Sequence, residues 1–483
     1  MTKTINSLKW VFASTVLRRF MSFLLFLYIV RIFSRAELGV YREFALILTF
    51  ASVTAIFSFN VFIIVERSKK YFNQGLQFIL LSSIVLSVVL FALRSFLAEQ
   101  YQHHDLYLYI QYGFWLVIPE TLKRLVKSTH ELDMNFKLLS IAETINVVFY
   151  CLLCIILFAI DQKFYYFIIA FYLGNIVELA IISYPLRKNL VKGFFECLKL
   201  KYFIPLIQVF KTNFSFLSLS TAPTVLNIII SDAPVLLLGL FYFPSYIGVY
   251  FIASQLVTAP ISLITHSLSQ VLFPALSLTD RVQLPMKVND YIKHVIYILW
   301  IPILVFGILL KYFTHIMIGV HEDLTLINAI IVVLTFKSLF FLIINPLSTI
   351  PNVCKKPQYE LYWSIGSLLS ICTMVYLFHG LDFIYMVYLI TFLSIVGMYF
   401  FMFIVYKLIK IPMKCFWILT GKGILYSLPL ILLLMFGDNS NMWLGMVCLV
   451  LFVIVSGYCM YWSEREFYRG LLKRFKASPL SST

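Results

Sequence analysis

Long apolar runs, separated by short charged or polar breaks, repeat along the whole chain. Fourteen of these runs are close to the roughly twenty residues that a helix needs to cross a bilayer. The expected spans are 10–33, 44–65, 76–98, 106–126, 138–160, 164–186, 213–241, 246–272, 291–311, 324–344, 361–379, 382–406, 421–437 and 442–462. The pattern predicts an all-α polytopic membrane protein with about 14 transmembrane helices.

The first span carries a polar stripe in the middle of an apolar helix. Ser14, Thr15, Arg18, Arg19 and Ser22 fall within roughly 140° of its circumference at about 100° per residue. Lipid cannot satisfy such side chains, so this face must contact protein or water.

Spans seven and eight carry similar stripes. Ser and Thr alone could serve only to let membrane helices pack closely. Charged or ionisable groups on the same faces favour a water-filled cavity instead, because each charge costs about 2.5–3.5 kcal/mol to insert. The key members of these stripes are Asn227, Asp232, Thr258 and His266.

A short motif returns in the second half of the chain. Gly39-Val40-Tyr41 follows the first span, and Gly248-Val249-Tyr250 follows the seventh. A partner six spans later has the same orientation, which predicts two parallel six-helix lobes related by an axis along the membrane normal. The expected divisions are an N-lobe at 1–186, a cytoplasmic linker at 187–212, a C-lobe at 213–408, and two extra helices with a basic tail at 409–483.

Composition and charge agree with a membrane protein and indicate its orientation. The chain is 61% hydrophobic and 12% charged, about half the charged share of a soluble domain. Its net charge of +16 is unevenly spread: of 38 Lys and Arg residues, 28 fall in alternate segments that include both termini, and 6 fall on the other side. Because Lys and Arg collect in cytoplasmic loops, both termini are expected in the cytoplasm, and no nucleic-acid partner is expected. The basic, aromatic-rich segment 187–211 is expected to lie on the membrane surface.

The cations within spans are candidates for contact with an anionic cargo. The guanidinium groups of Arg18 and Arg19 offer paired donors suited to phosphate. The alternative is an ion pair with Glu143 or Glu178, which lie in the same half of the membrane. Lys337 is the corresponding cation of the second lobe, with a structural ion pair or an interfacial position as its alternative.

The acidic groups and one histidine are candidates for coupling to H⁺ or Na⁺. Asp232 could bind the coupling ion or neutralise Arg31. Glu178, Glu143 and His266 could relay protons, and the carboxylates could instead pair with the arginines. Glu43, at the start of the second span, is expected at the membrane interface.

Catalytic and metal-binding patterns are missing from the sequence. There is no phosphate-cradling glycine loop, no metal-ligand spacing and no nucleophile with a plausible base. We therefore expect a protein that is not an enzyme and that needs no cofactor.

Three motifs, in order and at the right spans, resemble one family. They are Arg31-x-Phe33-Ser34-x-x-Glu37-Leu38-Gly39-x-Tyr41-Arg42, Asp232-x-x-x-Leu236-Leu237-Leu238-Gly239-Leu240-Phe241, and Val271-Leu272-Phe273-Pro274-Ala275-Leu276-Ser277. They are similar to the polysaccharide transporter (Wzx-type flippase) branch of the multidrug/oligosaccharidyl-lipid/polysaccharide (MOP) exporter superfamily. The chain lacks the acidic residue that this branch often has before Gly248.

The resemblance implies a MATE-like fold and translocation of an undecaprenyl-diphosphate-linked oligosaccharide across the bacterial cytoplasmic membrane. The arginines would hold the diphosphate, the hydroxyl-rich faces would hold the sugars, and the product would feed O-antigen or capsule assembly. Membrane lipids, a polysaccharide polymerase and chain-length machinery are the expected partners. Two alternatives stay open: a drug/cation antiporter of the same fold, and a membrane polymerase or ligase that uses the same lipid-linked sugars.

Overall fold

The computed structural model describes most of the chain. The described residues are 2–65, 71–101, 104–133, 135–161, 165–187, 234–277, 281–318, 324–348, 350–354, 358–437 and 442–465, with isolated positions and short stretches between 163 and 230 and at 356, 467 and 468. Within these ranges the secondary structure is helical and no strand occurs.

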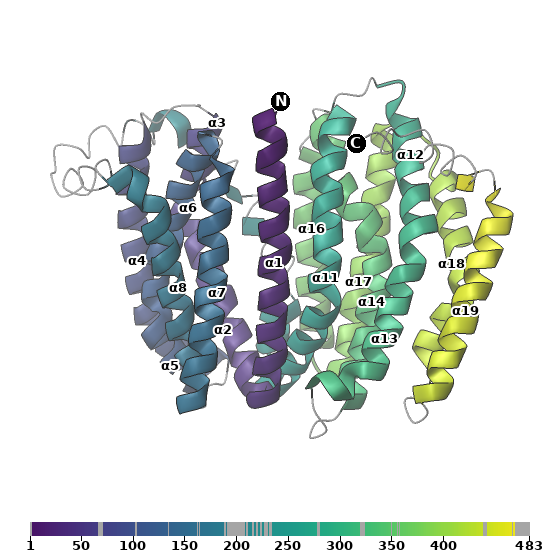
Figure 1. Ribbon diagram of the computed structural model, residues 1–483, viewed down its shortest axis with the longest axis horizontal. Coiled ribbons are helices and arrows are strands. Elements are labelled where there is room, and N and C mark those ends of the chain that lie inside the picture. The colour runs from purple at the N-terminus through teal and green to yellow at the C-terminus, as the bar shows by residue number, and fades with distance from the viewer. Residues whose placement is uncertain are drawn as a thin grey trace. The chain divides into compact units, whose positions relative to one another are not determined.

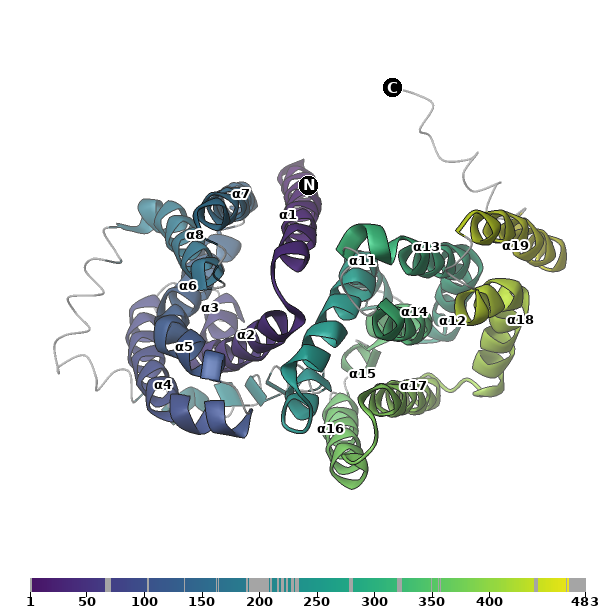
Figure 2. The ribbon, with the colours of Figure 1, turned by 90° about the horizontal axis from the view of Figure 1, so that it is seen from below.

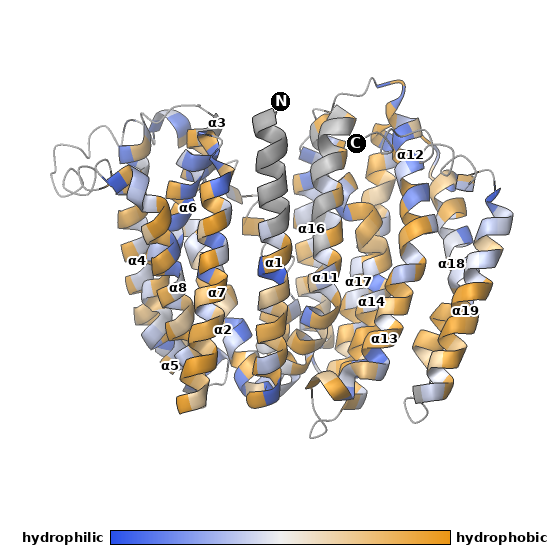
Figure 3. Ribbon diagram, in the orientation of Figure 1, coloured by the Kyte–Doolittle hydropathy of each residue, from blue (hydrophilic) through white to orange (hydrophobic). Residues whose placement is uncertain are grey.

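Ten of the described helices are long and apolar enough to cross a membrane, and all ten overlap predicted spans. Arg35–Ile56 overlaps the predicted span 44–65 only in part, because this helix starts at Arg35 and ends at Ile56, and a separate short helix covers Phe59–Val65. The prediction of an all-α, multi-pass membrane protein is therefore confirmed, while the count of fourteen spans stays a prediction. Figure 3 shows the apolar character of these helices and a hydrophilic turn partway along the helix labelled α1, Thr2–Ile32.

Contacts divide the chain into two compact units, residues 1–251 and 252–483. The first unit contains α1 (Thr2–Ile32), α2 (Arg35–Ile56), α3 (Phe59–Val65), α4 (Phe72–Gln100), α5 (His104–Gly113), α6 (Val117–Leu132), α7 (Phe136–Ile160) and α8 (Tyr165–Ser183), with short 3₁₀ turns η2 (Phe114–Leu116) and η3 (Tyr184–Leu186). The helix α11 (Pro244–Ser277) begins in the first unit and continues into the second. The predicted lobe and linker boundaries stay a prediction.

The second unit contains α12 to α19. Their bounds are α12 (Leu284–His294), a π-helical turn η5 (Val295–Leu299), α13 (Trp300–Ile318), α14 (Leu324–Leu347), α15 (Ile350–Val353), α16 (Gln358–Phe378), α17 (Phe383–Leu408), α18 (Lys414–Phe436) and α19 (Met442–Ser463). Pro260 lies inside α11, which runs unbroken across it. Within this unit α13 packs on α14, α18 and α19 (Figure 1).

In the first unit, α6 lies among its neighbours. It packs against α2, α4 and α8, while α7 packs against both α1 and α8 (Figure 2). Large apolar side chains on α4 and α7 stay exposed, including Val85, Val88, Leu152 and Ile156. Those surfaces suit the hydrocarbon of a bilayer, because lipid tails take the place of further protein there.

The predicted span 106–126 differs from the structure. Helix α5 ends at Gly113, a 3₁₀ turn follows, and α6 starts a new helix that continues to Leu132. Lys123 and Arg124 lie at the end of the predicted span, and Lys127 lies just beyond it. These cations lie on a helix that is packed on three sides.

The two Gly-Val-Tyr motifs meet in the first unit. A methyl group added at Gly39 would overlap the carbonyl oxygen of Pro244, and one added at Gly248 would overlap the carbonyl oxygen of Arg35. We call this contact the glycine crossing, since the first turns of α2 and α11 approach backbone to backbone there. Only residues without a Cβ permit such an approach.

The start of α2 is fixed by a capping box. The Ser34 hydroxyl accepts a hydrogen bond from the backbone N–H of Glu37 at 3.3 Å, and the Glu37 carboxylate accepts one from the backbone N–H of Ser34 at 2.9 Å. Two of the N–H groups that a helix start leaves open are thereby satisfied. The cap holds Gly39 in place for the crossing.

Candidate functional site

A network of charged side chains runs through the first unit and is centred on α6. Glu120, Lys123, Arg124 and Lys127 recur at helical spacing, so they share one face of that helix. The Glu120 carboxylate pairs with Lys123 at 2.7 Å and with Arg124 at 3.4 Å. This face turns inward and meets α7 and α8.

Lys127 links α6 to both of these helices. Its Nζ lies 2.7 Å from a carboxylate oxygen of Glu143 on α7 and 2.6 Å from one of Glu178 on α8. The Glu178 side chain is only 2% exposed. A buried carboxylate is tolerated when cations and hydrogen bonds surround it, and Lys127 supplies one such cation.

Lys123 completes the surroundings of Glu178. Its Nζ lies 3.5 Å from the Glu178 carboxylate and donates a hydrogen bond of 2.5 Å to the side-chain oxygen of Asn175. Asn146 on α7 donates a hydrogen bond to the same Glu178 oxygen, while Lys127 lies against the other one. Two cations and an amide thus surround the Glu178 carboxylate.

Arg18 joins the network from α1. Its Nη1 lies 2.6 Å from a Glu143 carboxylate oxygen, and the guanidinium also donates to the Thr15 hydroxyl at 3.1 Å. The Arg18 side chain remains 26% exposed and that of Glu143 remains 21% exposed. This pair therefore forms the accessible edge of the network, while Arg19 beside it is exposed.

The network is close to neutral but keeps an excess of positive charge. Its four cations, Arg18, Lys123, Arg124 and Lys127, face three carboxylates, Glu120, Glu143 and Glu178. The balance of +4 and −3 leaves +1, and exposed Arg19 adds another positive charge next to it. An anion that reaches this edge therefore finds donors already held in place.

The structure brings together Arg18, Glu143 and Glu178 from the residues proposed on sequence grounds. For Arg18 it shows the ion pair with Glu143 that was the alternative to cargo contact, and Glu178 pairs with lysines rather than with an arginine. Contact of Arg18 and Arg19 with a cargo stays a prediction.

The remaining proposed residues lie elsewhere. In the second unit, the Thr258 hydroxyl donates to the backbone carbonyl of Ser254 at 2.6 Å, and Lys337 is half-buried on α14. Asn227 and Asp232, together with the side chain of His266, lie outside the described residues.

Two features escaped the sequence analysis. The first is the role of α6, although the spacing of Glu120, Lys123, Arg124 and Lys127 at i, i+3, i+4 and i+7 is itself a signal of one charged helix face. The second is Glu43, which was expected at the interface. Its side chain is fully buried in the protein, which the sequence did not indicate.

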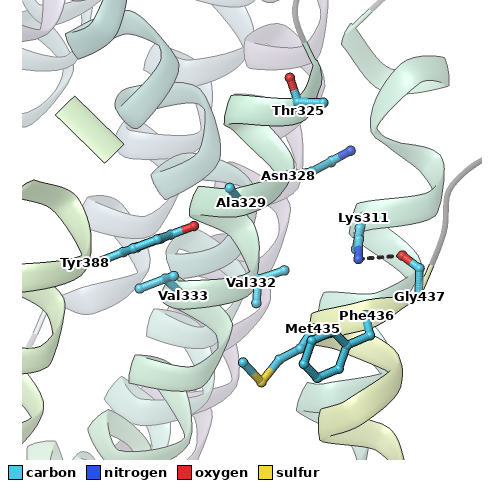
Figure 4. A pocket seen from close by; sticks show the side chains of 10 residues that line it. All are labelled: Lys311, Thr325, Asn328, Ala329, Val332, Val333, Tyr388, Met435, Phe436 and Gly437. Carbon is cyan, nitrogen blue, oxygen red and sulfur yellow. Dashed lines mark hydrogen bonds between the residues drawn. The ribbon is translucent and has the colours of Figure 1, made fainter. Parts of the chain in front are cut away.

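A largely apolar groove in the second unit lies beside another cation, Lys311. It has a volume of about 620 Å³ and lies beside Lys311, Asn328 and Tyr388, with apolar side chains from α14 and α18 along its wall (Figure 4). The Lys311 ammonium donates to the backbone carbonyls of Leu434 at 3.0 Å and Gly437 at 2.8 Å. It thus satisfies carbonyl groups at the end of α18, as cations at helix C-termini do.

This arrangement of helices matches solved membrane transporters. A structure titled "Lipid II flippase MurJ, inward closed conformation" aligns with a TM-score of 0.71 at 15% identity, covering 95% of this chain and 99% of that chain. An inward-facing multidrug resistance MATE family transporter of the MOP superfamily aligns with a TM-score of 0.58 at 12% identity, covering 81% and 96%. The chain is therefore a multi-pass membrane protein with the fold of these transporters.

The family follows from the sequence comparison. A family model described as polysaccharide biosynthesis protein (Polysacc_synt_3) matches residues 28–320, more than half of the chain, and the chain belongs to this family. The resemblance inferred from the three motifs is confirmed at this level. No curated protein matches the sequence.

Proposed function

We propose that this protein is a flippase that moves undecaprenyl-diphosphate-linked oligosaccharide units from the inner to the outer leaflet of the bacterial cytoplasmic membrane. The units would serve surface polysaccharide assembly, such as O-antigen or capsule. Membership of a polysaccharide biosynthesis family supports this cargo, and the fold it shares with a lipid II flippase supports the translocation of a lipid-linked sugar.

The observation that carries the proposal is the accessible edge of the charge network. Arg18 and Arg19 lie partway along a membrane helix, and the Arg18 guanidinium stays partly exposed although it is paired. A diphosphate can replace the Glu143 carboxylate as its partner, since phosphate oxygens accept the same paired N–H donors. Lys127 keeps its contact with Glu143 during this exchange and limits the cost of releasing that carboxylate.

The transport step would be alternating access. The head group enters from the cytoplasm while the polyprenyl chain stays in lipid. The two halves of the transporter then move so that the head-group site opens to the outer side instead of the cytoplasm. Both termini would be cytoplasmic, as the distribution of Lys and Arg predicts. A gradient of H⁺ or Na⁺ would bias the two states, and a polymerase with its chain-length machinery would consume the flipped units.

A MATE-type drug/cation antiporter is the second candidate, and the fold likeness to such a transporter supports it. Cationic drugs call for free acidic groups in the cavity. Here the three carboxylates of the network are all paired with cations, and the network keeps an excess of positive charge. This balance favours an anionic cargo.

A strain that lacks this protein tests the proposal. Complete lipid-linked units should accumulate on the cytoplasmic leaflet, and expression of the wild-type chain should restore their arrival on the outer leaflet. Arrival of single units on the outer leaflet without polymerisation would point to a polymerase, and an unchanged pool of lipid-linked units together with lost drug resistance would point to an antiporter.

A further inference from the structure

One buried carboxyl group in the first unit has no part in the charge network. Glu43 lies on α2 and is 0% exposed. Neither of its carboxyl oxygens has a hydrogen-bond partner among the described residues. The carboxylates of the network, in contrast, all pair with lysine or arginine.

The surroundings of Glu43 are a glycine and an aromatic ring. A Cβ built on Gly239 would lie 2.6 Å from a Glu43 carboxyl oxygen and 3.0 Å from the ring of Tyr101. The segment 234–239 carries no titratable side chain. The buried carboxyl group therefore has glycine backbone and ring carbon beside it.

The charged groups near α2 do not neutralise Glu43. The guanidinium of Arg42, its neighbour in sequence, lies over the ring of Phe251, 5.5 Å from its centroid. On α6 the cations pair with carboxylates of the network. The other titratable groups on elements that pack against α2 are Arg94, Glu99 and Tyr101 at the end of α4, His104, Asp105, Tyr107, Tyr109 and Tyr112 on α5, His130 and Glu131 on α6, and Tyr246, Tyr250 and His266 on α11. The side chains of His104 and His266 lie outside the described residues, and the His130 ring pairs with the backbone carbonyl of Ile182 at 2.8 Å. Of all these groups, Tyr101 lies against the same glycine as Glu43.

An ionised carboxylate cannot stay in such a place without a cation, because nothing replaces the water it loses. A metal ion would need several oxygen ligands, and no group of three or more His, Cys, Asp or Glu that could hold one occurs among the described residues. A proton needs only the carboxyl group itself. Protonated Glu43 is therefore the form that this enclosure accommodates.

The position of Glu43 connects this proton to the glycine crossing. Glu43 follows Gly39 by four residues, so both lie on one face of α2. Gly39 contacts the start of α11, and Glu43 lies against Gly239 just before it. The same helix α11 continues into the second unit. Opening of the crossing would expose this face of α2, hydrate Glu43 and let its proton leave.

We propose that Glu43 is a proton-binding site of this transporter, neutral while the glycine crossing is closed and ionised when the crossing opens to water. The proposal deepens the proposed function, because it names the group through which a proton gradient would bias the two states. Glu43 is not one of the four coupling candidates chosen from the sequence, which are Asp232, Glu143, Glu178 and His266.

Infrared difference spectroscopy between acidic and alkaline buffer tests the site on the purified full chain in lipid nanodiscs. The wild type should show the carbonyl stretch of a protonated, dehydrated carboxyl group, and Glu43→Gln should lose it. Glu99→Gln removes an exposed carboxyl group at the end of α4 and should keep the band. An unchanged band in Glu43→Gln would overturn the proposal. If Glu43→Gln does not fold, Glu43→Asp serves as the test variant. It should shift the carbonyl band of the protonated carboxyl group, and an unshifted band would contradict the assignment to Glu43.

Hydrogen–deuterium exchange tests the link to the crossing. After correction for the intrinsic rate, alkaline buffer should raise deuterium uptake in the peptide that covers 35–43 of the wild type but not of Glu43→Gln. Equal uptake in both proteins would overturn the coupling. Neither the infrared nor the exchange measurement uses a cargo. The two measurements therefore test the proton-binding site even if the flippase proposal fails, and the two failures can be distinguished.

Discussion

Cations on the helices of the two units have different kinds of partner. In the first unit, Lys127 and Arg18 pair with the side chains of Glu143 and Glu178. In the second, Lys311 binds backbone carbonyls at the end of α18. A side-chain partner can swing away and be replaced by an anion, whereas a carbonyl at a helix end is fixed by the helix. The comparison teaches that Arg18 and Lys127 are cations that a cargo can recruit, whereas Lys311 is not.

The largest effect is expected where the network is most deeply buried. Glu178→Ala leaves Lys123 and Lys127 without their shared carboxylate and should destabilise the protein by about 3–5 kcal/mol, as breaking a buried ion pair does. The measurement is the midpoint of thermal unfolding of the purified protein in detergent. Glu99→Ala removes an exposed carboxylate and should change stability by no more than about 0.5 kcal/mol. Equal midpoints for both variants would show that Glu178 does not hold the network together.

A smaller loss is expected from the fixed cation of the second unit. Lys311→Met removes the donor to the Leu434 and Gly437 carbonyls and should destabilise the protein by about 1.5–3 kcal/mol. Its translocation activity per folded molecule should stay at the wild-type level, because this lysine is committed to a helix end. Loss of activity with normal stability would contradict the contrast between the units and place Lys311 at a cargo site.

The smallest effect is expected at the glycine crossing. Gly248→Ala forces a methyl group into the backbone of Arg35 and should destabilise the protein by about 1–3 kcal/mol through overpacking. Gly366→Ala on α16 is the matched control, because no atom lies within 4 Å of an added Cβ there. Helix propensity should then favour alanine by up to about 1 kcal/mol. The two unfolding midpoints should move in opposite directions, and a shared direction would show that the crossing is not tight.

The spans were predictable because lipid imposes a simple rule on the sequence. Runs such as 138–160 and 324–344 are apolar over most of their length, with one charged residue each, and the structure has α7 and α14 there. The family motifs were equally visible, because they lie at the turns of α2 and α11. These features depend on local sequence.

The network and the buried carboxyl group depend on contacts between distant segments. Lys123 and Lys127 follow an apolar run and resemble loop cations, until α7 and α8 supply Glu143 and Glu178 across from them. Glu43 is close to a predicted span end, where charged groups are common. Only the approach of Gly239, nearly two hundred residues away in sequence, encloses it.

The central claim is that Arg18 and Arg19 meet the diphosphate of a lipid-linked cargo, and a translocation assay in the deletion strain tests it most directly. The double variant Arg18→Ala, Arg19→Ala should insert into the membrane normally and leave lipid-linked units on the cytoplasmic leaflet. Arg18→Lys with Arg19→Lys keeps the charge without the paired donors and should restore part of the activity. Full translocation by the double alanine variant would contradict the account.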